Sequence, residues 1–166
     1  MRRIAVVLAL AFAMCGVGGA GASRTVKHSH RYQVAARLAR GLRGTPLAGY
    51  GFAFEAEGHR WNVNPAMVAA IAGTESSFGA QACGVNYFGW NSCNSAAPWS
   101  TVRASITYVT RDLRQRYMNR WGKRDVYSIG LTYCGAGCGW RWAYGPHGVL
   151  QFMRNRFGSG PGVVYP

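Results

Sequence analysis

The sequence predicts a single, mainly α-helical domain with little or no β-sheet. Apolar residues recur at helical spacing in several separate stretches, and residues typical of helix ends bound most of them. Alternation of apolar and polar residues, the pattern of a half-buried strand, never extends beyond a few positions. The length of 166 residues is enough for one domain with its own core. We therefore expect about five to six helices.

The first 22 residues have the pattern of a secretory signal peptide. Arg2 and Arg3 give the positive start, an apolar run follows, and residues 20–22 form a small-residue cleavage site. The apolar run is short for a transmembrane helix. Lipid attachment at Cys15 is an alternative, but the residues before it match poorly. We expect a secreted or cell-wall-associated protein of bacterial type.

Residues 23–46 contain six Arg or Lys residues and no acid, so they are predicted to form a flexible basic leader. Within them, residues 31–43 have an alternative as a short amphipathic helix on an anionic surface. The whole chain carries a formal net charge of +14. In an exported protein such a charge favours anionic cell-wall polymers as partners rather than nucleic acid, and solubility alone is the simpler explanation.

The folded domain is expected to span residues 47–158, followed by a flexible tail at 159–166. The expected helices are residues 47–60, 64–79 and 101–121, one beginning at Asp125, and 147–157. Ser100 is the predicted cap of the long third helix, and Gly158 ends the last one. Residues 83–98 and 134–145 are expected to be loops.

The central helix carries the candidate acid. Asn64 is a suitable N-cap before Pro65, and Gly79 is suited to end the helix. Glu75 lies on the same face as the apolar Ile71 and in the last turn, where the helix dipole is negative. Burial and the dipole both disfavour the ionised form, so we expect a raised pKa, as a general acid near neutral pH requires.

An exported chain with an even number of mature cysteines predicts disulfides. Cleavage after residue 22 leaves Cys83, Cys93, Cys134 and Cys138. Three pairings are possible, and Cys83–Cys93 with Cys134–Cys138 is preferred because each closes a short loop. The spacing does not match a zinc site, so neither a metal nor another cofactor is expected.

Two motifs resemble the lysozyme-like superfamily. The helix-borne Glu-Ser of NPAMVAAIAGTESSFG and the following NYFGW loop are similar to the glucosaminidase domain of endo-β-N-acetylglucosaminidase-like cell-wall hydrolases and to the related lytic transglycosylases. TYCGAG at residues 132–137 resembles the tyrosine motif of the transglycosylases, although Cys134 stands where an Asn often follows the Tyr. The similarity covers residues 47–157. It implies a lysozyme-like fold with a substrate cleft.

The resemblance also implies cleavage of β-1,4 bonds between N-acetylglucosamine and N-acetylmuramic acid in peptidoglycan. Glu75 matches the catalytic acid, and Tyr133 matches a tyrosine across the cleft. Five residues are expected to bind substrate or form the cleft wall, with Trp90 in the cleft and neighbouring Phe88 in the core: Ser76, Asn86, Tyr87, Gly89 and Trp90. Gly89 is expected to permit close approach or a positive φ.

No second carboxylate follows a motif that would place it opposite Glu75. Asp112 is expected to face solvent between arginines, and Asp125 to cap a helix. The leading hypothesis is therefore one carboxylate acting as acid and then base, assisted by the substrate's acetamido group or an internal hydroxyl. Which bond is cut, and whether hydrolysis or anhydro-sugar formation follows, stays open.

Other classes of function remain as alternatives. A monomeric, non-catalytic wall-binding protein on the same scaffold is one, and a membrane-active cationic protein that uses residues 31–43 is another. A cysteine protease that pairs Cys134 with His147 needs a free thiol, which an oxidising compartment disfavours.

Overall fold

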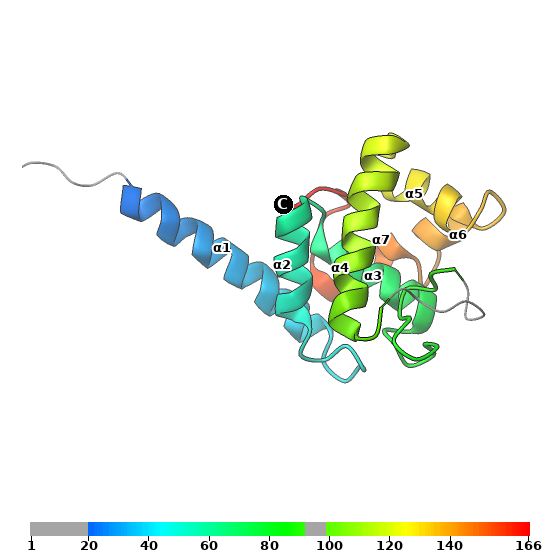
Figure 1. The fold of residues 1–166 in the computed structure, drawn as a ribbon, viewed down its shortest axis with the longest axis horizontal. Coiled ribbons are helices and arrows are strands. Elements are labelled where there is room, and N and C mark those ends of the chain that lie inside the picture. Colours follow the sequence, from blue (N-terminus) through cyan, green and yellow to red (C-terminus); the bar gives the residue numbers. More distant parts are fainter. Residues whose placement is uncertain (1–19, 92–98) are drawn as a thin grey trace, which may run out of the picture.

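The computed structural model describes residues 20–91 and 99–166 (Figure 1). The helices are α1 (Ala20–Gly41), α2 (Gly51–Trp61), α3 (Pro65–Ser76), α4 (Val102–Asp112), the π-helix η1 (Leu113–Arg120), α5 (Val126–Tyr133), α6 (Gly139–Tyr144) and α7 (Val149–Phe157). No strand occurs in these residues; a single isolated bridge pairs Cys83 with Asn86. The mainly α prediction is confirmed, and the arrangement is consistent with a lysozyme-like domain.

Helix α3 is buried and packs against α2, α4 and α7. The Asn64 side chain accepts a hydrogen bond from the Ala66 N–H, and Pro65 begins the helix, as predicted. Every residue from Pro65 to Gly73 is buried, so this helix is enclosed on all sides rather than amphipathic. It ends at Ser76, before the predicted end at Gly79, because Ser77 already adopts the left-handed conformation; Gly79 also has a positive φ, of +97°.

The N-terminal segment differs from the prediction of a flexible leader at residues 23–46. Helix α1 runs through most of it and lies along α2, while its N-terminal part extends away from the other helices (Figure 1). Val34, Leu38 and Leu42 are buried at helical spacing, which anchors the C-terminal half of α1 in the core. Residues 1–19 of the expected signal peptide lie outside the described residues. None of the helices described is both long enough and apolar enough to cross a membrane.

The C-terminal tail is docked rather than flexible. Val163 is buried, and its carbonyl accepts a hydrogen bond from the Asn64 N–H at 2.8 Å. The hydroxyl of Tyr165 donates to Glu55 of α2 at 2.8 Å. The packed domain therefore extends beyond the predicted limits of 47–158 at both ends.

The expected long helix at residues 101–121 is present as two joined segments. Thr101, not Ser100, caps α4 by accepting from the Ala104 N–H. The wider π-helix η1 then continues the rod to Arg120. A change to π geometry inside a helix moves the side chains that follow it around the axis. Tyr117 of η1 is buried, against Trp90 and Tyr133.

The predicted Cys134–Cys138 disulfide is present. It closes the turn between α5 and α6, and α6 forms inside a stretch that was expected to be a loop. Asp125 caps α5 and Gly158 ends α7, both as predicted. The other expected pair includes Cys93, which lies outside the described residues.

Candidate active site

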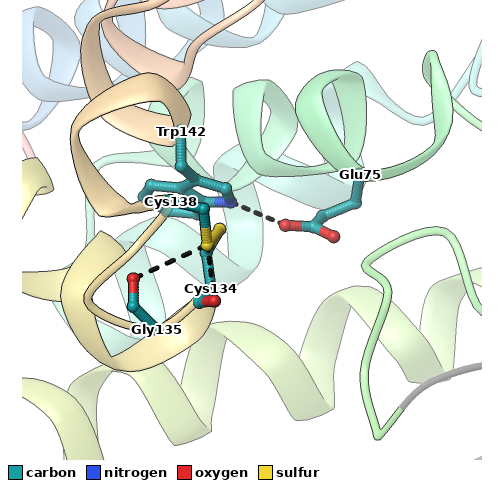
Figure 2. The surroundings of a disulfide bond; sticks show 5 residues. All are labelled: Glu75, Cys134, Gly135, Cys138 and Trp142. Carbon is teal, nitrogen blue, oxygen red and sulfur yellow. Dashed lines mark hydrogen bonds between the residues drawn. A yellow bond between two sulfur atoms is a disulfide. The ribbon is translucent and has the colours of Figure 1, made fainter.

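Glu75 and Trp142 meet at the centre of the candidate site. Glu75 is the next-to-last residue of α3, and its Oε1 accepts a hydrogen bond from the Trp142 indole N–H at 2.6 Å. Figure 2 shows the indole and the carboxylate facing one another from two different helices, with the Cys134–Cys138 disulfide beside the indole. The second oxygen, Oε2, accepts no hydrogen bond from the residues described. One oxygen is thus held by the Trp142 indole, and the other has no hydrogen-bond donor among the described residues.

The environment of Glu75 favours its protonated form. Burial raises the pKa of the half-buried carboxyl above its ordinary value, and the hydrogen bond from Trp142 lowers it in part. None of the ion pairs among the described residues involves Glu75. Without a cation to stabilise the carboxylate, the net pKa stays raised, as the sequence predicted.

Gly89 lies directly against the free oxygen of Glu75. Its φ of +61° is in the left-handed region, and a Cβ built there would overlap Oε2. A side chain at this position would be strained and would also displace the carboxylate. The expectation of a positive φ or a close approach at Gly89 is therefore confirmed in both respects.

Ser76 and Asn86 hold the loop that carries Gly89. The Ser76 hydroxyl donates to the Tyr87 carbonyl at 2.7 Å and accepts from the Gly79 N–H at 2.9 Å. Asn86 is buried, and its amide brackets Trp90, donating to the carbonyl at 2.8 Å and accepting from the N–H at 3.1 Å. Both residues were predicted to bind substrate or to form the cleft wall. The structure instead uses their polar atoms inside the protein, where they position the loop.

The aromatic residues of this loop are less open than expected. Phe88 is fully buried, as predicted, but Trp90 is also buried, at 8% exposure, with edge contacts to Tyr108 and Tyr133. The ring of Tyr87 lies over Gly79. The expected flat sugar platform at Trp90 is therefore mostly covered, because three tyrosines of α4, η1 and α5 surround its ring.

Tyr133 links the loop to the Trp142 side of the site. Its hydroxyl donates to the Phe88 carbonyl at 2.5 Å, immediately before Gly89. Its ring stacks on Trp142, with centroids 5.3 Å apart. Burial, followed by the charge of Glu75, raises the pKa of Tyr133 well above its ordinary value, so the hydroxyl stays protonated. It therefore fixes Gly89 over Glu75 and supports the indole that binds Glu75.

Two hollows adjoin these residues and share Tyr133. The larger, of about 540 Å³, is lined by Thr74, Glu75, Tyr133, Cys134, Cys138, Arg141, Trp142, Gly145, Pro146 and His147. The smaller, of about 330 Å³, is lined by Gly89, Trp90, Asn91, Arg116, Tyr117, Thr132 and Tyr133. Within the described part of the chain, Glu75 is the only acid that lines either hollow.

The other four acids serve elsewhere. Glu55 pairs with Arg31 and accepts from Tyr165, Glu57 accepts from the Trp61 indole, and Asp125 caps α5. Asp112 does not face solvent as expected: its side chain is 12% exposed, and its Oδ2 is buried without a hydrogen-bond partner. Burial raises the pKa of Asp112, opposed by Arg116 and Arg111. None of the four lines either hollow, which agrees with the absence of a motif for a second acid.

Sequence reasoning did not identify Trp142 or Arg141. Both belong to α6, whose six residues begin at Gly139 and were assigned to a loop. Trp142 lies 67 residues from the acid to which it donates. The one available signal was the Gly- and Trp-rich composition of residues 137–145.

No protein-family model matches the chain, and no curated protein matches it either. Among the residues described, no group of three His, Cys, Asp or Glu side chains is placed to hold a metal ion.

Proposed function

We propose that this chain cleaves β-1,4 glycosidic bonds of peptidoglycan, with Glu75 as general acid and then general base. The observation that carries the proposal is the state of Glu75. It lines a hollow of about 540 Å³, has one oxygen held by Trp142 and the other free, and has a raised pKa. Burial that disfavours the ionised form favours the protonated carboxyl group that a general acid needs.

The chemistry follows from a single acid. Protonated Oε2 donates its proton to the glycosidic oxygen as the bond from that oxygen to the anomeric carbon breaks. The acetamido oxygen of the sugar that carries this anomeric carbon attacks the carbon. This oxygen takes the place of an enzyme nucleophile. Glu75, now a carboxylate, accepts a proton from a water or from a hydroxyl of the sugar as the oxygen of that group attacks the anomeric carbon and the bond from this carbon to the acetamido oxygen breaks. Water gives a hydrolysed end, and the hydroxyl gives an anhydro sugar.

The neighbours of Glu75 support this role by fixing its geometry. Tyr133 holds the Phe88 carbonyl and Ser76 holds the Tyr87 carbonyl, so the loop that carries Gly89 is tied to both α5 and α3. Gly89 leaves space at Oε2. Such preorganisation is needed because small displacements of a catalytic group lower rates strongly.

The choice of peptidoglycan rests on the export signal, the motif resemblance and the charge. A net charge of +14 attracts an anionic wall polymer and increases the rate of encounter. The protein would act outside the cytoplasm, as a secreted or wall-associated monomer.

Purified peptidoglycan provides the test. The chain without residues 1–22 is expected to release soluble glycan fragments, and Glu75→Gln is expected to lower that rate by about 100-fold or more. Glu57→Gln is the matched control, since Glu57 lines neither hollow. Binding without release of fragments, or near-normal activity of Glu75→Gln, would contradict the proposal.

A further inference from the structure

The larger hollow is lined by an arginine and a histidine as well as by its acid. Arg141 of α6 and His147, in the connection from α6 to α7, both line it. The segment that carries His147 is tied to α3, because the His147 carbonyl accepts a hydrogen bond from the Thr74 hydroxyl at 2.9 Å, one residue before Glu75. The hollow therefore has both a carboxyl group and a guanidinium group among its lining residues.

Arg141 has no acidic partner within the protein. All five acids of the chain lie in the described part, and each has another role: Glu55, Glu57 and Asp112 form ion pairs with Arg31, Arg60 and Arg116, Asp125 caps α5, and Glu75 is bound by Trp142. Arg141 is exposed, and its stem passes close to Gly145, where a Cβ would approach the Arg141 Cγ to 3.1 Å. Its guanidinium is thus available to an anion outside the chain.

The anion must be compatible with the neighbouring acid. A guanidinium group that paired with Glu75 would favour the carboxylate, yet Glu75 forms no ion pair. An anion of the ligand that binds Arg141 neutralises the positive charge of the guanidinium, so in the bound complex this charge does not favour the carboxylate form of Glu75. A planar guanidinium matches a carboxylate through two parallel hydrogen bonds, which ammonium groups do not provide.

We propose that Arg141 binds a carboxylate of the glycan strand beside the bond that Glu75 cleaves, so that the hollow selects carboxylate-bearing sugars over neutral ones. This inference rests on the proposed function and specifies its substrate. N-acetylmuramic acid carries a lactyl carboxyl group, which is free in stem-free glycan and joined to a peptide in intact wall. A polymer of N-acetylglucosamine has neither the lactyl nor the peptide carboxylate.

Three substrates separate these sources: peptidoglycan with its peptides, stem-free glycan, and stem-free glycan whose carboxyl groups have been reduced to alcohols. For each we would measure kcat/KM with the wild type, Arg141→Gln and Arg103→Gln. Arg103 is exposed on α4 and lines neither hollow, so Arg103→Gln removes one positive charge at a position outside both hollows. The wild type is expected to prefer a carboxylate-bearing strand over the reduced strand by about tenfold, the value of one charged hydrogen-bonded contact.

Arg141→Gln should lose this preference, and Arg103→Gln should keep it. The substrate that shows the preference, intact or stem-free, identifies the peptide or the lactyl carboxylate as its source. An unchanged preference in Arg141→Gln, or an equal loss in Arg103→Gln, would overturn the inference. If the wild type cleaves none of the three, the proposed function fails. Binding of the same strands to Glu75→Gln with and without Arg141→Gln then tests the carboxylate site without turnover.

Discussion

Glu55 and Glu75 are both withdrawn from solvent on neighbouring helices, but the protein treats them in opposite ways. Glu55 receives two hydrogen bonds from Arg31, at 2.7 and 3.0 Å, and one from Tyr165 at 2.8 Å. Burial raises its pKa, but these partners outweigh burial and the net pKa is lowered. Glu75 has one neutral donor, and its pKa is raised.

The difference separates a structural carboxylate from the one that we propose to be catalytic. The two oxygens of Glu55 join α1, α2 and the C-terminal tail, so its charge is satisfied and holds three parts of the chain together. Glu75 has one oxygen that accepts nothing from the described residues and lies at a hollow. A half-buried carboxyl group whose hydrogen-bonding capacity is incompletely used lowers the stability of the fold and is typical of functional sites.

The largest expected effect tests the space around the free oxygen of Glu75. Gly89→Ala places a Cβ where Oε2 now lies, so activity on peptidoglycan should fall by about 100-fold. Gly84→Ala is a matched control, because Gly84 has a similar φ of +60° but nothing within 4 Å of its added Cβ. Equal losses of activity in the two variants would show that backbone strain, rather than displacement of Glu75, is responsible.

Removal of the structural carboxylate should mainly affect stability. Glu55→Gln cannot ion-pair with Arg31, and the free energy of unfolding at pH 7 should fall by about 1 to 2 kcal/mol. Because the folded pKa of Glu55 is lowered, its contribution is present above its unfolded pKa and is lost as the pH falls through the folded pKa. Chemical denaturation at pH 7 and at acid pH measures both the loss of stability and its dependence on pH. Glu57→Gln should change stability by less than about 0.5 kcal/mol.

Replacement of Glu75 should change the free energy of unfolding in the opposite direction from replacement of Glu55. The raised folded pKa of Glu75 means that its contribution to stability is present below its unfolded pKa and is lost as the pH rises through the folded pKa. Glu75→Gln should therefore be more stable than the wild type at neutral pH, by up to about 1 kcal/mol, and the gain should vanish at acid pH. A loss of stability at neutral pH would contradict the comparison with Glu55.

The smallest effect concerns the indole donor. Trp142→Phe removes the hydrogen bond that lowers the pKa of Glu75 in part, so the pKa should rise further. Since the first step requires protonated Glu75, the alkaline limb of kcat should move to higher pH. Trp140→Phe, on the same helix but exposed, should leave the limb unchanged. A limb that stays in place or moves to lower pH in Trp142→Phe would exclude this role for the indole.

Local signals in the sequence were sufficient for much of the fold. The caps at Asn64 and Asp125 depend on neighbours within a few residues, and the structure confirms both. Burial of Phe88 and the positive φ of Gly89 also follow from residue type in a short loop. The position of Glu75 in the last turn of a helix follows from the same local pattern.

Contacts between distant segments were not predictable in this way. The Glu75–Trp142 and Glu55–Tyr165 hydrogen bonds join residues separated by 67 and 110 positions. Val163 and Tyr165 lie in a tail without periodicity, and its docking depends on Asn64 and Glu55. The covered ring of Trp90 likewise depends on packing of three helices, which no single stretch of sequence specifies.

Mass spectrometry of the fragments released from purified peptidoglycan tests the central claim most directly. The account predicts that the wild type yields products cut between N-acetylglucosamine and N-acetylmuramic acid, with either hydrolysed or anhydro ends, and that equally folded Glu75→Gln yields almost none. Intact glycan strands after wild-type treatment, or the same products from Glu75→Gln, would contradict it.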